Sequence, residues 1–176
     1  MSGRRIWSIL AIVIVFMLSA CTGSGVSLTD YQNNIRKATV QWEYGVAEYT
    51  ADITFDGEVP EDSSECRAAA INFTSPEELT GLSVRFADGT ATASVGKVKL
   101  DLPESAGREL YLLVKLFSLY PVEMAESTGD SAKFRMTVDG EEAEFDVSYK
   151  GSVPKSAIIT AGGDEIKVTE INVSLK

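Results

Sequence analysis

The sequence predicts an α+β fold: a strongly curved antiparallel sheet of about eight or nine strands, a half-barrel, with one long and one or two short helices on its concave side. After residue 48, apolar and polar residues alternate with the period of two that is typical of half-buried strands. Turn signals at 88–89, 139–140 and 162–164 separate such runs and predict antiparallel hairpins. The long helical pattern covers residues 103–121.

The first twenty residues have the pattern of a lipoprotein signal peptide. Two arginines at 4–5 precede an apolar run over 6–18, which is shorter than the roughly 20 residues that a membrane-spanning helix needs. The run ends in Leu-Ser-Ala-Cys at 18–21, which resembles the bacterial lipobox. That resemblance implies removal of residues 1–20 and lipidation of Cys21. The alternative is a plain secretory signal with a cysteine near its cleavage site.

The expected mature chain begins with the lipidated Cys21 and a flexible linker over 21–27, and continues as one domain over 28–176. A lipid anchor with two attachment signals places it outside the cytoplasm, on the bacterial cell membrane but not across it. Without the two arginines it carries 14 basic and 26 acidic side chains, a net charge of −12, which disfavours nucleic acid. Cys66 then has no thiol to pair with. We expect a monomer.

The pattern along the chain predicts a short helix at 29–38, where Leu28, Tyr31, Ile35 and Ala38 recur at helical spacing, and a helical turn at 75–79 capped by Ser75. The predicted strands lie at 48–55, 66–73, 82–86, 90–95, 98–102, 134–138, 145–149, 157–160 and 166–175. Within the last strand the apolar positions change from even to odd numbers, which predicts a β-bulge near Thr169 or Glu170.

The long helix is apolar over an unusually wide arc. At 100° per residue, its leucines, Val114 and Phe117 spread over about 220°, whereas an ordinary surface helix needs little more than about 100°. Only a narrow strip, formed by Tyr111, Lys115 and Ser118, is polar. The excess apolar surface therefore has to be covered, either by the sheet or by a ligand.

One stretch carries a family resemblance. Residues 71–103, INFTSPEELTGLSVRFADGTATASVGKVKLDLP, followed by an apolar helix and further hairpins, resemble the surface lipoproteins with the LolA-like half-barrel, a group that includes LolB, LppX and LprG. The most specific part is SPEELTGL at 75–82. The resemblance implies a single sheet folded around helices that plug its hollow side, and a role in carrying lipids or the acyl chains of lipoproteins.

The chain has no catalytic signature, so we expect neither an enzyme nor a cofactor. It contains no histidine, which excludes nucleophile–histidine catalysis and histidine metal sites. Ser152 and Lys155 have the S-x-x-K spacing, but Pro154 between them disfavours the helix that this motif needs. The acidic residues over 139–144 could attract a hard cation, but a solvated hairpin tip explains them better. No metal site is predicted.

Small residues at alternating positions suggest where a ligand could lie. Cys66, Ala68 and Ala70 share one face of a predicted strand, and Ala91 and Ala93 share one face of another. Such residues either let the helix pack closely or leave room for an apolar pocket between sheet and helix. For the pocket, the predicted lining residues are Ala68, Ala70, Val84, Phe86, Ala91, Ala93, Leu113 and Phe117.

These patterns favour a membrane-anchored, non-enzymatic lipoprotein that binds or carries a lipid or acyl-like ligand. Its expected partners are the membrane, through Cys21, and a lipid or an acylated protein. The alternative is an interaction or structural module of the cell envelope with a fully packed core and no ligand.

Overall fold

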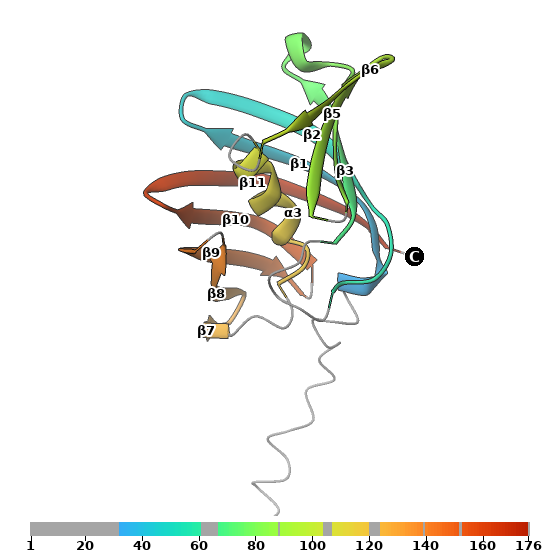
Figure 1. Ribbon diagram of the computed structural model, residues 1–176. Coiled ribbons are helices and arrows are strands. Elements are labelled where there is room, and N and C mark those ends of the chain that lie inside the picture. Colours follow the sequence, from blue (N-terminus) through green and yellow to red (C-terminus); the bar gives the residue numbers. More distant parts are fainter. Residues whose placement is uncertain are drawn as a thin grey trace, which may run out of the picture.

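The described residues form one antiparallel sheet of eleven strands that curves around a helix (Figure 1). The structure, a computed structural model, describes residues 32–60, 67–87, 89–103, 107–119, 124–138, 140–151 and 153–175. The predicted signal peptide, the linker with Cys21, and Cys66 lie outside these ranges. The half-barrel that the LolA-like resemblance implies is confirmed as the architecture of this chain.

The order of strands across the sheet is β6-β5-β4-β3-β2-β1-β11-β10-β9-β8-β7. In chain order the elements are β1 (Ile35–Tyr44), β2 (Ala47–Phe55), β3 (Ala69–Ser75), the 3₁₀ helix η1 (Glu77–Leu79), β4 (Leu82–Ala87), β5 (Thr90–Val95), β6 (Val98–Leu102), α3 (Arg108–Lys115), β7 (Met124–Thr128), β8 (Ser131–Val138), β9 (Glu141–Lys150), β10 (Val153–Ala161) and β11 (Asp164–Leu175).

The strand count exceeds the predicted eight or nine because the sequence pattern predicts neither β1 nor β7. The predicted helix at 29–38 is correct for residues 32–34, which are helical, and wrong from Ile35 onward, where β1 begins. The cause is a bulge between Ile35 and Lys37 in the pairing with β11. It puts the buried Ile35 and Ala38 three residues apart, which is also the spacing of a helix face.

The second predicted irregularity is confirmed. Gln41 pairs with Glu170 and Trp42 pairs with Val168, so Thr169 is the extra residue of a bulge in β11. The hydroxyl of Thr169 donates a hydrogen bond to the carbonyl of Gln41, 3.3 Å away. The bulge keeps Ile166, Val168 and Ile171 on the buried face although their numbers change parity.

The predicted hairpins are present, and the helical turn differs in detail. β4 pairs antiparallel with β5, β8 with β9, and β10 with β11. The predicted turn at 75–79 is the 3₁₀ helix η1, and its cap residue is Pro76 rather than Ser75. No side chain among the described residues donates or accepts a cap hydrogen bond there.

The helix on the concave side is shorter than predicted, and more of it is buried. α3 covers eight residues, and a turn continues it to Phe117. The residues from Leu112 to Leu119 are all buried, including Lys115 and Ser118, which are 1% and 2% exposed. The polar strip of the helix is therefore largely enclosed, because the sheet curves around both sides of α3 (Figure 1).

Candidate ligand-binding face

The centre of the concave face is filled by contacts between α3 and the sheet. The ring of Phe117 lies 5.1 Å from that of Phe55 in β2, centroid to centroid. At the other end of the helix, Tyr111 packs edge-on against Phe86 in β4, at 6.3 Å. Leu113, which lies between Tyr111 and Phe117 in the sequence, is fully buried. In the middle of the helix, the apolar surface is therefore covered by packing against the sheet and not by a ligand.

Four of the predicted lining residues come together on the concave face. Val84 pairs with Ala93, and Phe86 pairs with Ala91, across β4 and β5. A side chain placed on Gly107, just before α3, would lie 3.7 Å from the Phe86 ring and 4.0 Å from Cβ of Ala91. The start of the helix thus approaches this pair of strands closely.

Two predicted lining residues lie elsewhere. The buried residues of β3 are Ala69, Ile71 and Phe73, so Ala70 points to the convex face. There Ala70 is flanked by the exposed Thr54 and Arg85 on the neighbouring strands. Ala68, two residues earlier, precedes the strand. The prediction that Ala70 lies on the same face as Ala93 is wrong. Both faces of β3 carry alanine, so the pattern of small residues does not show which face is buried.

Beside α3, the concave face carries an apolar surface that no described residue covers completely. Pairing across β4, β5 and β6 aligns its members in three rows on one face. Val95, Val98 and Leu100 are 57%, 72% and 65% exposed, and the others are partly buried or lie at the edge. We call this surface the inner edge strip; it consists of Leu82, Ala91, Ala93, Val95, Val98, Leu100 and Leu102.

Aromatic side chains occupy the inner face of β1 to β3. Trp42 stacks on Tyr49 with ring centroids 5.3 Å apart, and both rings approach Phe73. Trp42 and Phe73 are buried, whereas Tyr49 is partly exposed. Together with the inner edge strip, these rings make the β1–β6 half of the concave face continuously apolar.

Sequence reasoning missed a buried cation. Arg67 is 1% exposed, and its guanidinium donates hydrogen bonds to the carbonyl of Gly57 from Nε (3.1 Å) and Nη2 (2.7 Å) and to the carbonyl of Gln32 from Nη1 (2.9 Å). It also lies over the ring of Phe55, 5.3 Å from the centroid. Burial lowers the pKa of Arg67 from its ordinary value. The only signal in the sequence is parity, since Arg67 alternates in step with the apolar Ile71.

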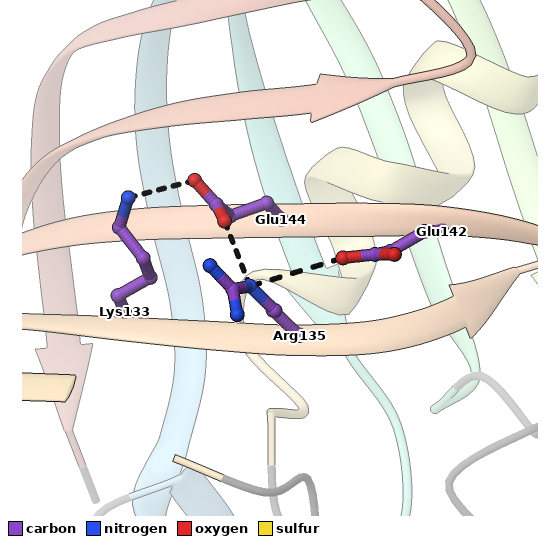
Figure 2. Close-up of polar contacts among 4 residues, drawn as sticks. All are labelled: Lys133, Arg135, Glu142 and Glu144. Carbon is purple, nitrogen blue, oxygen red and sulfur yellow. Dashed lines mark hydrogen bonds and ion pairs between the residues drawn. The ribbon is translucent and has the colours of Figure 1, made fainter. Parts of the chain in front are cut away.

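The described acidic residues of the predicted hairpin, Glu141, Glu142 and Glu144, form ion pairs with cations of the chain. On the outer face of β8 and β9, Glu144 accepts hydrogen bonds from Lys133 (2.8 Å) and Arg135 (2.9 Å), as Figure 2 shows. These two contacts lower the pKa of the Glu144 carboxyl, that from Lys133 first. Glu141 pairs with Arg108 at the start of α3. Among the described residues, no group of acidic side chains or thiols is arranged to hold a metal ion.

The part of the chain that the structure describes contains no helix long and apolar enough to span a membrane. The inner edge strip consists of apolar side chains alone, so it can offer a ligand apolar contact but no ion pair. Such a surface suits a hydrocarbon chain or an apolar protein segment.

No protein-family model matches the chain, and no curated protein matches it significantly in sequence. Solved structures resemble it in architecture. An uncharacterized conserved protein from Thermus thermophilus is 14% identical, with a TM-score of 0.46 and 86% of each chain covered. The LolA superfamily protein NE2245 from Nitrosomonas europaea is 12% identical, with a TM-score of 0.45 and coverage of 85% of this chain and 92% of that one. MucB is 13% identical, with a TM-score of 0.42 and coverage of 84% and 56%.

Proposed function

We propose that this protein is a membrane-anchored, non-enzymatic lipoprotein that binds an acyl-type ligand along the inner edge strip. The observation that carries the proposal is the exposure of Val95, Val98 and Leu100 on the concave side of the sheet, where side chains of a half-barrel would otherwise be core. The ligand lies beside α3 rather than beneath it, because Phe117 and Tyr111 already fill the space under the helix.

The energetics suit a long hydrocarbon chain. Each methylene group moved from water to an apolar surface contributes about 0.8 kcal/mol. Eight methylenes would then contribute about 6 kcal/mol before the cost of association, so a longer chain is needed for micromolar binding. The three rows of the inner edge strip present an apolar path of this kind without charged side chains.

A pair of matched substitutions tests the site. Ala93→Trp fills the inner edge strip, whereas Ala70→Trp adds the same bulk to the convex face, and both alanines are partly exposed. We expect the wild type and Ala70→Trp to take up a fluorescent fatty-acid probe, and Ala93→Trp to lose at least about tenfold in affinity. Probe uptake that neither substitution changes, or that Ala70→Trp alone abolishes, would place the ligand elsewhere.

The anchor belongs to the same proposal and is supported by the lipobox-like sequence at 18–21. Cys21→Ala removes the thiol that would be acylated, and the protein is then expected to leave the membrane fraction of cells. Cys66→Ala is the matched control and should fractionate like the wild type. Retention of Cys21→Ala in membranes at the wild-type level would contradict lipidation as the anchor.

A second candidate function is the envelope interaction module without a ligand. The burial of Phe117 and Leu113, and the contact of Phe117 with Phe55, favour it, since the centre of the concave face needs no ligand to be filled. The probe experiment separates the two candidates, because an interaction module takes up no fatty-acid probe.

A further inference from the structure

The free edge of β6 is the feature that the proposed function leaves unexplained. In the described part of the sheet, β6 is the last strand on its side and has only β5 as a neighbour. An exposed edge presents unpaired backbone N–H and C=O groups, which other chains can extend as a further strand. In Figure 1 the hairpin of β5 and β6 projects at the top right of the view, away from the β7–β11 half of the sheet.

We propose that β6 pairs antiparallel with β6 of a second copy of this chain, about a two-fold axis at Leu100. The sequence of the strand, Val98-Lys99-Leu100-Asp101-Leu102, is complementary to itself when reversed. In that register Lys99 lies opposite Asp101 of the second copy, Val98 lies opposite its Leu102, and Leu100 meets its own counterpart. A contact in which each copy uses the same patch is the usual form of a two-fold dimer.

The backbone favours the same register. Val95 and Val98 close a two-residue turn, with Gly96 at φ 59°, so Val98, Leu100 and Leu102 direct their backbone groups toward β5. Lys99 and Asp101 then direct theirs to the free edge, and in the proposed register these two residues pair with each other across the axis. Pro103 has no N–H, which ends the pairing after Leu102.

Charge selects this register against its neighbours. A shift by two residues in one direction brings Lys99 opposite Lys99, and in the other direction Asp101 opposite Asp101, and like charges directly opposite each other are destabilising. The proposed register instead forms two Lys–Asp pairs. β6 is also electrically neutral in a chain whose net charge is −10, so it is a place where two copies meet with little repulsion. Asp101 accepts a hydrogen bond from Thr92, at 3.1 Å, which holds the carboxylate on the convex face.

The pairing also joins the two inner edge strips. Val98 and Leu100, which are 72% and 65% exposed in one copy, would gain the Leu102 and Leu100 of the second copy as cross-strand neighbours. The inference does not depend on a ligand, because it stands on the edge, the charges and the exposed side chains of β6. A dimer of this kind differs from the monomer that the sequence predicts.

Cysteine cross-linking of the full chain in its native membranes tests the register. Facing residues that are not hydrogen-bonded to each other lie about 4.5 Å apart in Cα position, which permits a disulfide. In a Cys66→Ser background, Leu100→Cys is expected to give a cross-linked band of twice the monomer mass after mild oxidation, lost on reduction. Val98→Cys is the control, because its two copies would lie about 13 Å apart along the strands.

A charge exchange keeps the test independent of folding. Added to Leu100→Cys, Lys99→Asp places Asp opposite Asp and is expected to reduce the cross-linked fraction about tenfold. The further change Asp101→Lys restores opposite charges and should restore the cross-link. The inference is overturned if Leu100→Cys gives no homodimer, cross-links mainly to another protein, or cross-links no better than Val98→Cys, and equally if the exchanged pair does not recover.

Discussion

At the scale of single residues, Arg67 connects the segments that precede β1 and follow β2. Its guanidinium binds the carbonyls of Gln32, which lies just before β1, and of Gly57, which lies just after β2. Two segments on either side of the first hairpin are thereby held by one side chain that is itself buried. A planar group with donors on three nitrogens is needed for this, and lysine has only one nitrogen.

We therefore expect Arg67→Ala to lower the free energy of unfolding by about 3 kcal/mol or more, because the buried carbonyl of Gln32 and the partly buried carbonyl of Gly57 both lose their charged donor. Arg67→Lys should recover less than half of that loss. The measurement is the midpoint of denaturant unfolding, with Arg135→Ala on the exposed outer face as the control, expected within about 1 kcal/mol of wild type. An Arg67→Ala protein as stable as that control would contradict the role assigned to Arg67.

Tyr149 gives a prediction for alkaline pH. Burial raises the pKa of its phenol to about 12, from a usual value of 10.0. Above about pH 10 the unfolded chain loses this proton while the folded chain keeps it, so the folded state binds more protons and the free energy of unfolding falls as the pH rises from about 10 to 12. The slope from one group is at most about 1.4 kcal/mol per pH unit.

Tyr149→Phe removes this titration. Its free energy of unfolding, followed by denaturation at several pH values from about 9 to 12, should therefore decline less steeply than that of the wild type. The two proteins should agree in slope below about pH 9, where the phenol is protonated in both states. Parallel curves over the whole range would show that Tyr149 is ionised as readily in the folded protein as in the unfolded one.

At the scale of elements, the burial of α3 can be predicted from the sequence, but its exact length cannot. The apolar arc correctly indicates a helix enclosed on more than one side, and Leu113 and Phe117, two of the predicted pocket-lining residues, are buried. The helix ends at Lys115, however, because periodicity cannot distinguish a regular helix from the turn that continues it to Phe117. The burial of Lys115 over the Tyr111 ring, at 5.8 Å, depends on the curvature of the sheet, which no local pattern encodes.

Phe117→Ala tests how much this element contributes to the core. Truncating a buried phenylalanine costs about 3–5 kcal/mol, and Phe117 loses its contact with Phe55 as well. Val46→Ala, in the exposed turn between β1 and β2, is the control and should change stability by less than about 1 kcal/mol. Thermal or denaturant unfolding measures both; a small effect of Phe117→Ala would mean that α3 is not part of the stable core.

The strands show the complementary limit of sequence reasoning. Most strands can be predicted from alternation and turns, and the bulge at Thr169 from a change of parity. The same kind of bulge gives the start of β1 the apolar spacing of a helix. The bulge cannot be recognised locally, because the partner strand β11 lies more than a hundred residues away in the sequence. Which face of β3 is buried also depends on its neighbours, so Ala70 could not be separated from Ala69 by sequence.

At the scale of the whole molecule, the half-barrel divides its concave face into two parts. Around α3 the face is packed, with the rings of Phe55 and Phe86 against the helix. Toward β6 it is apolar and open. The ligand-binding proposal and the proposed dimer both follow from this open part, one from its surface and the other from its edge, and they can fail separately.

The measurement that tests the central claim most directly is native mass spectrometry of the full-length protein extracted from membranes in mild detergent. We predict a species heavier than the covalently lipidated chain by the mass of a non-covalent acyl-type ligand, released on denaturation and lost in Ala93→Trp but not in Ala70→Trp. A ligand-free mass for the wild type, together with no uptake of a fatty-acid probe, would contradict the proposal that the inner edge strip binds a lipid.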